Sequence, residues 1–211
     1  YQTSISMLQG LSNSKSFPMA RVPWNEPGII MKMLDLGIMG IIAPMINTKN
    51  DCEKFVSYCY YPPIGQRSFG PMRAQLVHGS KYFDHANKNI ISFAMIETKQ
   101  AVENLDEILS VPELTGVYIG PADMSSSYGL QPKFDVRDDP VFSNIKLIAK
   151  KAKEHGKIAG IHNGSTEYAK EMIKLGYKFV TILSDFRIMS SNSQKIIDEM
   201  KNQNSDKSES S

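Results

Sequence analysis

Short apolar runs alternate with longer amphipathic stretches along most of the chain. The apolar runs are nearly continuous and are bounded by Gly, Pro or polar residues, a pattern typical of parallel strands that are covered on both faces. The sequence therefore predicts six strands, at residues 17–23, 40–46, 90–97, 115–122, 157–162 and 177–183.

The stretches between these runs carry apolar residues at helical spacing, together with signals for helix ends. Asn25 and Asn47 are candidate N-caps, and Gly37, Gly156 and Gly176 stand where helices should end. Helices are therefore predicted at residues 1–15, 26–37, 48–61, 99–111, 140–156 and 165–176.

Strand–helix repeats of this kind build two α/β architectures. A spacing of about 30 residues per unit favours a (β/α)8 or TIM barrel, of which about six of the eight units are present. A doubly wound sheet is the alternative, but the Gly-rich phosphate turn that it usually carries is absent from the sequence. We expect residues 1–200 to form a single, partial TIM-barrel domain. Residues 62–89 should form a long loop, as an active-site flap or a subunit contact, and residues 201–211 a disordered polar tail.

The composition restricts the classes of partner. The 24 basic and 22 acidic residues are scattered and give a formal net charge of +2, which argues against a nucleic-acid partner. The chain has only two cysteines, Cys52 and Cys59, and neither a secretory-signal pattern nor an apolar run of membrane-spanning length. We therefore expect a cytoplasmic protein with no membrane partner.

Charged side chains follow several of the predicted strands at the point where each strand ends. Arg21, Glu97, Asp123 and His162 occupy such positions. Because the carboxyl ends of parallel strands meet at one edge, these side chains should line one rim. If the strands that precede Glu97 and Asp123 are neighbours, the two carboxylates are close enough to share a divalent cation. Mg²⁺ and Mn²⁺ suit such a site, because they accept two carboxylates and keep several waters.

Each of these residues also has a structural explanation. Glu97 and Asp123 could each cap the following helix, Arg21 could pair with a core-facing acid, and a lone strand-end histidine more often packs than acts as a base. Trp24 follows Arg21 closely enough to line a pocket. Apart from Lys99, no lysine near the central strand ends offers itself for a Schiff base, so carbonyl chemistry would use a metal instead.

Four ordered motifs between about Thr3 and residue 190 carry a family resemblance. They are "ARVPWNEPGIIMKMLDLGIMGIIAPMINT", "YPPIGQRSFGP", "MIETKQAVENLDEIL" and "GVYIGPADMSSSYG". Together they resemble the metal-dependent (class II) pyruvate aldolases of the 4-hydroxy-2-oxoheptanedioate aldolase and citrate lyase-like family. The resemblance implies a TIM barrel of the phosphoenolpyruvate/pyruvate type that cleaves a 4-hydroxy-2-oxo acid reversibly to pyruvate and an aldehyde through a metal-stabilised enolate. It also implies a homo-oligomer, commonly a hexamer, with a C-terminal helix exchanged between subunits.

The resemblance also implies roles for single residues. Glu97 and Asp123 match two acids that bind a divalent metal, with Mg²⁺ or Mn²⁺ as the first candidates and Co²⁺ as a further one. Arg21 matches a catalytic arginine beside the pyruvate keto oxygen. The turn that receives the pyruvate carboxylate matches Gly120, Pro121, Ala122 and Asp123. Trp24, by its position after the Arg21 strand, is a further candidate substrate contact.

Two departures from the family pattern leave other functions open. The family's base histidine belongs to a Gly-Glu-His segment that we expect to lie just upstream of this chain, together with two further strands. Asp35 matches the catalytic aspartate that partners this histidine, and Met95 stands where many members carry a glutamine. The alternatives are therefore other enolate chemistry, such as oxaloacetate decarboxylation or acyl-CoA cleavage, and a catalytically silent fragment.

Overall fold

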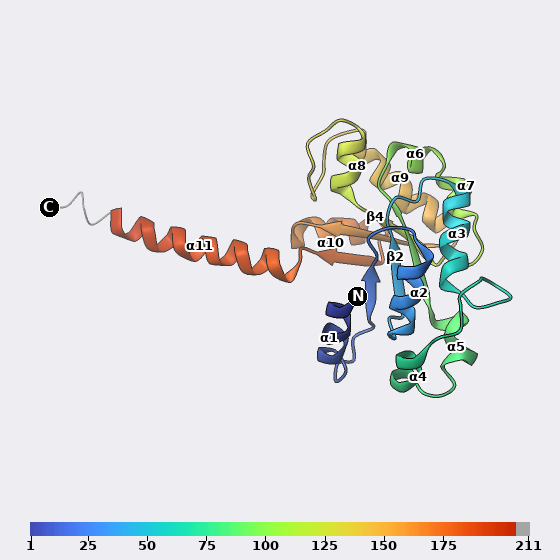
Figure 1. Ribbon diagram of the computed structural model, residues 1–211. Coiled ribbons are helices and arrows are strands. Elements are labelled where there is room, and N and C mark those ends of the chain that lie inside the picture. The colour runs from blue at the N-terminus through green and yellow to red at the C-terminus, as the bar shows by residue number, and fades with distance from the viewer. Residues whose placement is uncertain (206–211) are drawn as a thin grey trace.

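Six parallel strands form one sheet in the order in which they occur along the chain. The computed structural model describes residues 1–205 and is shown in Figure 1. The strands are β1 (Met19–Arg21), β2 (Gly40–Ala43), β3 (Ile91–Ile96), β4 (Gly116–Ile119), β5 (Ile158–Asn163) and β6 (Phe179–Ile182). All six predicted strands are confirmed. Because every neighbouring pair is parallel, all the carboxyl ends lie at one edge of the sheet.

The helices between β1 and β6 connect successive strands and cover one face of the sheet, whereas α1 precedes β1 and α11 follows β6. They are α1 (Gln2–Gly10), α2 (Pro27–Asp35), α3 (Lys49–Cys59), α4 (Met72–His78), α5 (Tyr82–Asn89), α6 (Lys99–Glu103), α7 (Leu105–Leu109), α8 (Pro121–Ser127), α9 (Val141–Glu154), α10 (Thr166–Lys174) and α11 (Asp185–Ser205). Contacts of α2, α3, α9 and α10 with the strands form the outer layer. A doubly wound sheet would carry helices on both faces.

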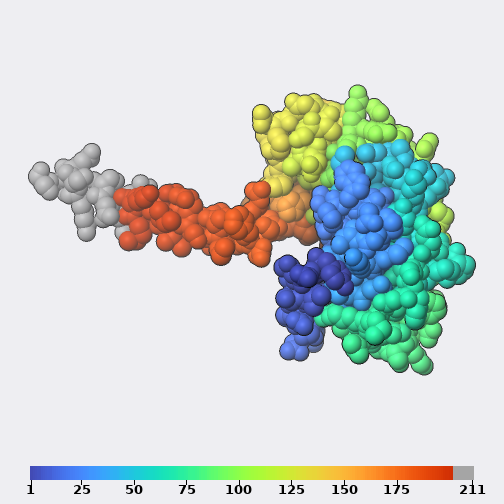
Figure 2. All heavy atoms as spheres, in the orientation of Figure 1, coloured from blue at the N-terminus to red at the C-terminus, as the bar shows by residue number. Residues whose placement is uncertain are grey.

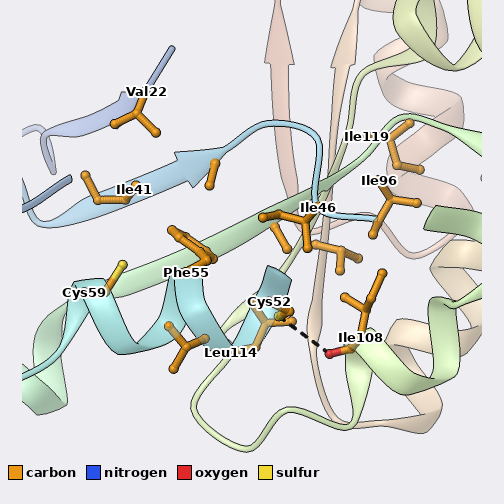
Figure 3. Close-up of a cluster of buried hydrophobic side chains, with 14 of the residues drawn as sticks. Val22, Ile41, Ile46, Cys52, Phe55, Cys59, Ile96, Ile108, Leu114 and Ile119 are labelled. Carbon is orange, nitrogen blue, oxygen red and sulfur yellow. Dashed lines mark hydrogen bonds between the residues drawn. The ribbon is translucent and has the colours of Figure 1, made fainter. Parts of the chain in front are cut away.

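Alternation of side chains along the strands divides the core into two parts. The outward-facing residues pack against the helices in a large cluster that also contains Cys52, Phe55 and Ile108 (Figure 3). The inward-facing residues form a separate, smaller cluster, Ile42, Phe93, Met95 and Tyr118. This arrangement, with helices outside and side chains filling a curled sheet, is that of part of a (β/α)8 barrel.

Two of the predicted helix caps are wrong. Glu26 caps α2, because its carboxylate accepts hydrogen bonds from the backbone N–H groups of Gly28 and Ile29. Thr48 caps α3 in a capping box with Asp51. The neighbouring Asn25 and Asn47 therefore do not cap these helices. The prediction that Gly37, Gly156 and Gly176 end helices is confirmed. These glycines follow α2, α9 and α10 and have the positive φ values typical of helix C-termini, 96°, 67° and 106°.

The prediction of a long loop over residues 62–89 is wrong, because this segment contains α4 and α5. Burial of Ala74, Tyr82 and Ala86 against the main core stabilises both helices. The helix predicted at 99–111 is divided into α6 and α7. The short helix α8 was not predicted, because it begins directly at the end of β4, with Pro121 in its first turn.

Helix α11 projects from the body of the molecule as a separate arm (Figures 1 and 2). It carries six exposed apolar side chains, namely Phe186, Ile188, Met189, Ile196, Ile197 and Met200. The helix continues to Ser205, so residues 201–205 of the predicted polar tail are helical, whereas residues 206–211 lie outside the described residues. None of the helices in the described part of the chain has the length and apolar character needed to cross a membrane.

Candidate active site

Inward-facing residues at the carboxyl ends of the strands line a cavity of about 290 Å³. Its wall combines the ends of β1 to β4, the first turn of α8, one loop residue and β5, namely Arg21, Ile42, Met95, Tyr118, Gly120, Pro121, Ala122, Asp123, Phe134 and His162. The structure thus brings together three predicted features: Arg21, the substrate turn Gly120–Asp123, and Asp123 as one of the two predicted metal ligands.

A larger cavity, of about 520 Å³, lies at the opposite edge of the sheet. It is lined by residues that precede β5 and β6, and by lysines of α9 such as Lys146, Lys150 and Lys153. None of the strand-end residues reaches it. Because chemistry in parallel α/β barrels takes place at the carboxyl ends of the strands, the smaller cavity is the candidate site.

Glu97 lies directly after β3 and is only 1% exposed. Its Oε1 accepts a hydrogen bond of 2.7 Å from the backbone N–H of Met45, whereas Oε2 is buried and has no partner among the described residues. Met45 presents this N–H from a left-handed conformation, with φ of 56°, which is uncommon for a non-glycine residue. The pKa of Glu97 is raised above its ordinary value, mainly because the side chain is buried. The hydrogen bond from Met45 lowers this pKa, the charge of Asp123 raises it and the charge of Arg21 lowers it.

Asp123 shares the space in front of Gly120 with this unpartnered oxygen. A Cβ atom at Gly120 would lie 2.7 Å from Glu97 Oε2 and 3.5 Å from Asp123 Oδ2. The pairing of β3 with β4, which places Ile96 opposite Ile119, brings the two acids to this point as predicted. Within the described residues no group of three or more His, Cys, Asp or Glu side chains could hold a metal. Two carboxylates with one orphaned oxygen nevertheless fit a hard cation that keeps water ligands, such as Mg²⁺ or Mn²⁺.

The capping explanation does not account for Glu97. Thr98 caps α6, because its side chain accepts a hydrogen bond from the N–H of Ala101. Asp123 lies in the first turn of α8, where a negative charge is stabilised by the helix, but no side-chain cap bond is present. The exposed side chain of Lys99 pairs with Glu103 on the surface, which excludes it as a buried Schiff-base lysine.

Arg21 ends β1 and is exposed at the open side of the cavity, so it is not paired within the core. Trp24 is 59% exposed and lies outside this cavity. It lines an adjacent cavity of about 350 Å³ together with Met45 and Asn47. Its role as a substrate contact stays a prediction.

Asp35 does not lie with the other predicted site residues. It ends α2, at the amino edge of the sheet, where its carboxylate pairs at 2.7 Å with Arg67. The Arg67 side chain is buried, lies over the ring of Tyr61 and donates a second hydrogen bond to Tyr82. The catalytic role that the resemblance implies for Asp35 therefore has no counterpart in the cavity of this chain and stays a prediction.

Three polar residues of the site form a chain that the sequence did not reveal. The hydroxyl of Thr181 on β6 lies 2.5 Å from Tyr118 Oη and 2.9 Å from His162 Nδ1. Phe134 packs edge-on against the His162 ring, with 4.9 Å between centroids. Burial lowers the pKa of His162, as does the charge of Arg187, while Asp135 raises it. Alternation along β4, β5 and β6 was the signal that could have indicated this grouping.

Comparison with known proteins identifies related enzymes. A family model described as HpcH/HpaI aldolase/citrate lyase matches residues 3–191. The chain is 39% identical over 191 residues to the hydroxypyruvate/pyruvate aldolase of Rhizorhabdus wittichii, which covers 90% of this chain and 76% of the relative. It is 34% identical over 201 residues to the 5-keto-4-deoxy-D-glucarate aldolase of Escherichia coli, which covers 94% of this chain and 78% of the relative.

Solved structures resemble the chain in fold. An HpcH/HpaI aldolase/citrate lyase family protein from Burkholderia cenocepacia J2315 superposes with a TM-score of 0.87 at 24% identity, over 95% of this chain and 80% of that one. An HpcH/HpaI aldolase from Desulfitobacterium hafniense DCB-2 gives a TM-score of 0.87 at 20% identity, over 95% and 78% of the two chains. The predicted α/β fold, a partial TIM barrel, is thereby confirmed.

Proposed function

Because the chain belongs to the HpcH/HpaI aldolase/citrate lyase family, and its named relatives are aldolases, we propose that it cleaves a 4-hydroxy-2-oxo acid reversibly to pyruvate and an aldehyde with a divalent metal ion. The observation that carries this proposal is the buried, unpartnered Oε2 of Glu97 beside Asp123. A buried carboxylate oxygen without a donor is costly, so its retention at the rim favours a cation-binding role.

Glu97 and Asp123 would hold the cation, with Mg²⁺ or Mn²⁺ preferred and Co²⁺ as a further candidate. When bound, such a cation supplies Lewis-acid stabilisation of negative charge on the keto oxygen of a 2-oxo acid. The hydrogen bond from Met45 fixes Oε1 and leaves Oε2 directed toward Asp123, so the protein orients the first ligand before any cation arrives.

Arg21 and the Gly120–Asp123 turn would position the substrate. The turn would receive the substrate carboxylate. It contains the first residues of α8, where Pro121 has no backbone N–H and the N–H groups of Ala122 and Asp123 have no carbonyl partner within the helix. The Arg21 guanidinium would then lie beside the keto oxygen. As the C3–C4 bond breaks, its electron pair forms the enolate of pyruvate, and Arg21 stabilises the charge that develops. The enolate takes up a proton at C3 to give pyruvate.

The test is release of pyruvate from 4-hydroxy-2-oxo acids by the purified chain. The panel includes 5-keto-4-deoxy-D-glucarate, the substrate in the name of one relative. We expect activity with Mg²⁺ or Mn²⁺, none with a chelator, and recovery when the metal is restored. Arg21→Ala should keep the metal-induced rise in melting temperature but lose turnover. Activity that survives both chelation and Glu97→Ala would refute the metal-dependent reaction.

We further propose that the chain forms a homo-oligomer, a hexamer as the resemblance implies, in which α11 docks on another copy. The support is the projecting arm with its six exposed apolar side chains (Figure 2). A helix that exposes such residues gains stability by burying them. Light scattering after gel filtration should give a multiple of 23.6 kDa. The double variant Phe186→Ser, Ile196→Ser should shift the mass toward the monomer.

A further inference from the structure

Five lysines line the larger cavity, which lies at the amino edge of the sheet and has a volume of about 520 Å³. Three of them, Lys146, Lys150 and Lys153, share one face of α9 at a spacing of i, i+4 and i+7. The other two, Lys157 and Lys178, directly precede β5 and β6. Among the residues that the structure describes, no aspartate or glutamate lines this cavity. Because the chain has 24 basic and 22 acidic residues in all, the excess of positive charge is local.

Two of these lysines have no ion-pair partner. Lys153 and Lys178 form no salt bridge with any described residue. On a neighbouring face of α9, by contrast, Lys151 pairs with Asp106 at 3.0 Å. The wall of the cavity consists of lysine, glycine and aliphatic residues. Positive charges gathered in this way repel one another, so the cavity is a place where an anion is favourable.

The structural roles of the other lysines on α9 compensate little of this charge. Basic residues near the end of a helix complement its dipole. Lys150 also lies 3.8 Å from Glu154, and Lys146 Nζ lies 4.1 Å from the centroid of the Phe142 ring. The side chain of Lys150 is 73% exposed, and a long ion pair in water contributes little. The cavity therefore keeps most of its positive charge.

Lys157 is held in the wall of the cavity. Its half-buried side chain donates hydrogen bonds of 2.9 Å and 2.7 Å to the backbone carbonyl oxygens of Val111 and Pro112. An ammonium group has three donors, so the third is available to a ligand. The buried residues Ala149 and Ala159 add an apolar surface to the same wall. A fixed polar group beside an apolar surface is the combination found in sites for small organic ligands.

We propose that this cavity binds a phosphorylated small molecule, of which a nucleoside diphosphate is the representative. Lysine presents a compact charge to phosphate oxygens, whereas arginine, which suits planar carboxylates, is absent from the lining. The volume lies within the range of about 300–1,000 Å³ typical of organic ligands, and the apolar wall would contact the organic part. The site is independent of the proposed function, because Arg21 and Asp123 lie at the opposite edge of the sheet.

Titration calorimetry with adenosine diphosphate (ADP) tests this proposal. A chelator is present throughout, so that no metal ion links the phosphates to the carboxylates of the candidate active site. We expect one ADP per chain, with an affinity that falls as NaCl is added, because salt screens the lysines. Adenosine lacks the phosphates and inorganic phosphate lacks the organic part, so both should bind more weakly than ADP.

Two double variants that remove the same charge separate the cavity from general attraction. Lys153→Gln with Lys178→Gln should weaken ADP binding about 10-fold or more, because hydrogen bonds to charged groups are lost. Lys81→Gln with Lys88→Gln changes exposed lysines at α5, outside the cavity, and should leave the affinity unchanged. Equal losses in the two double variants, or no binding of ADP to the wild type, would overturn the proposal.

A change of shape without a change of charge provides a second readout. Ala149→Met extends into the cavity and should weaken ADP binding, whereas Arg21→Ala alters the candidate active site and should not. Full affinity in Ala149→Met, or equal affinities for ADP and inorganic phosphate, would refute an organic phosphate as the ligand. The melting temperature without ligand shows whether Ala149→Met folds, and the lysine variants decide the outcome if it does not.

Discussion

The backbone of Met45 holds one oxygen of Glu97 and leaves the other without a partner. The bond from Met45 N–H to Oε1 measures 2.7 Å, and Oε2 is buried with no donor among the described residues. The left-handed φ of 56° at Met45 indicates that the chain accepts local strain to make this bond. Without a cation, the buried carboxylate of Glu97 therefore has an unfavourable negative charge, close to the carboxylate of Asp123.

Replacing Glu97 with Gln should stabilise the metal-free protein. The amide keeps an acceptor for Met45 N–H and directs its NH₂ group toward Asp123, so it removes the unpartnered carboxylate oxygen. We expect the melting temperature in a chelator to rise by about 2–4 °C, the shift that ~1 kcal/mol produces in a domain of this size. The same variant should lose the metal-induced rise in melting temperature. Glu103→Gln, on the exposed surface of α6, is the control and should change neither value.

The gain from Glu97→Gln should depend on pH. The folded-state pKa of Glu97 is raised above 4.5, so the ionised carboxylate is less favourable in the folded than in the unfolded state. Below pH 4.5 both states are protonated and the wild type bears no such cost. The cost develops as the pH rises from 4.5 through the folded-state pKa. Thermal scans in a chelator should therefore show the gap between variant and wild type widening with pH, and a gap that is constant or narrows would contradict this assignment.

Gly120 should be needed for the arrangement of the two acids. Its φ of −99° is accessible to alanine, so backbone strain is not the reason for glycine here. A Cβ would instead lie 2.7 Å from Glu97 Oε2 and 3.1 Å from Met95 Cε, which forces the carboxylate away from Asp123. We expect Gly120→Ala to weaken metal binding about 10–100-fold, measured by titration calorimetry, with a smaller effect on folding. Gly10→Ala is the control, because a Cβ there meets nothing within 4 Å.

The two cysteines should not react in the folded protein. Both are fully buried, and burial raises the pKa of Cys52 to about 12 and that of Cys59 further still. At pH 8 the reactive thiolate is therefore almost absent, and a reagent such as Ellman's cannot reach the sulfur. We expect no rapid release of thionitrobenzoate from the native chain and two equivalents after unfolding in guanidinium chloride. One fast equivalent in the native state would show that the packing around α3 is wrong.

The sequence predicted the strands and the family well, because both depend on local patterns. Continuous apolar runs marked all six strands, and the ordered motifs indicated the family that the family model and the named relatives confirm. Pairing of adjacent strands was then enough to bring Glu97 close to Asp123. The role of these acids as metal ligands stays a prediction.

What the sequence missed depends on contacts between distant segments. The Met45 N–H reaches Glu97 across 52 residues, and Thr181 reaches Tyr118 across 63. The Met45 contact leaves no local signal, and strand alternation indicates only the face on which Tyr118 and Thr181 lie, not that they meet. Pro and Gly near the start of the segment 62–89 favour a loop, whereas burial of a few side chains in the main core decides its helical state. Asp35 matched a catalytic residue by position in a motif, yet its partner in the structure is Arg67.

The pair between Asp35 and Arg67 should be a major contribution to stability. The Arg67 side chain is fully buried, and its partner is 26% exposed, so removal of the acid leaves a buried guanidinium without a charged partner. We expect Asp35→Ala to lower the free energy of unfolding by about 3 kcal/mol, measured by urea denaturation. Asp35→Asn, which keeps an acceptor for Arg67, should cost less. The double variant Asp35→Leu, Arg67→Met should recover much of the loss, because a buried pair can be replaced by apolar groups at little cost.

An ion pair on the surface with the same separation serves as a control, because it has the charges of the Asp35–Arg67 pair without its burial. Arg137 and Glu171 also lie 2.7 Å apart, but neither side chain is buried, since they are 61% and 34% exposed. Glu171→Ala should therefore leave the urea midpoint unchanged within error, because solvent screens an exposed pair. If the two alanine variants shift the midpoint equally, burial is not what gives the Asp35 pair its strength. If Asp35→Asn folds normally but loses aldol cleavage with an unchanged midpoint, then Asp35 also has the catalytic role that its position in the motif implies.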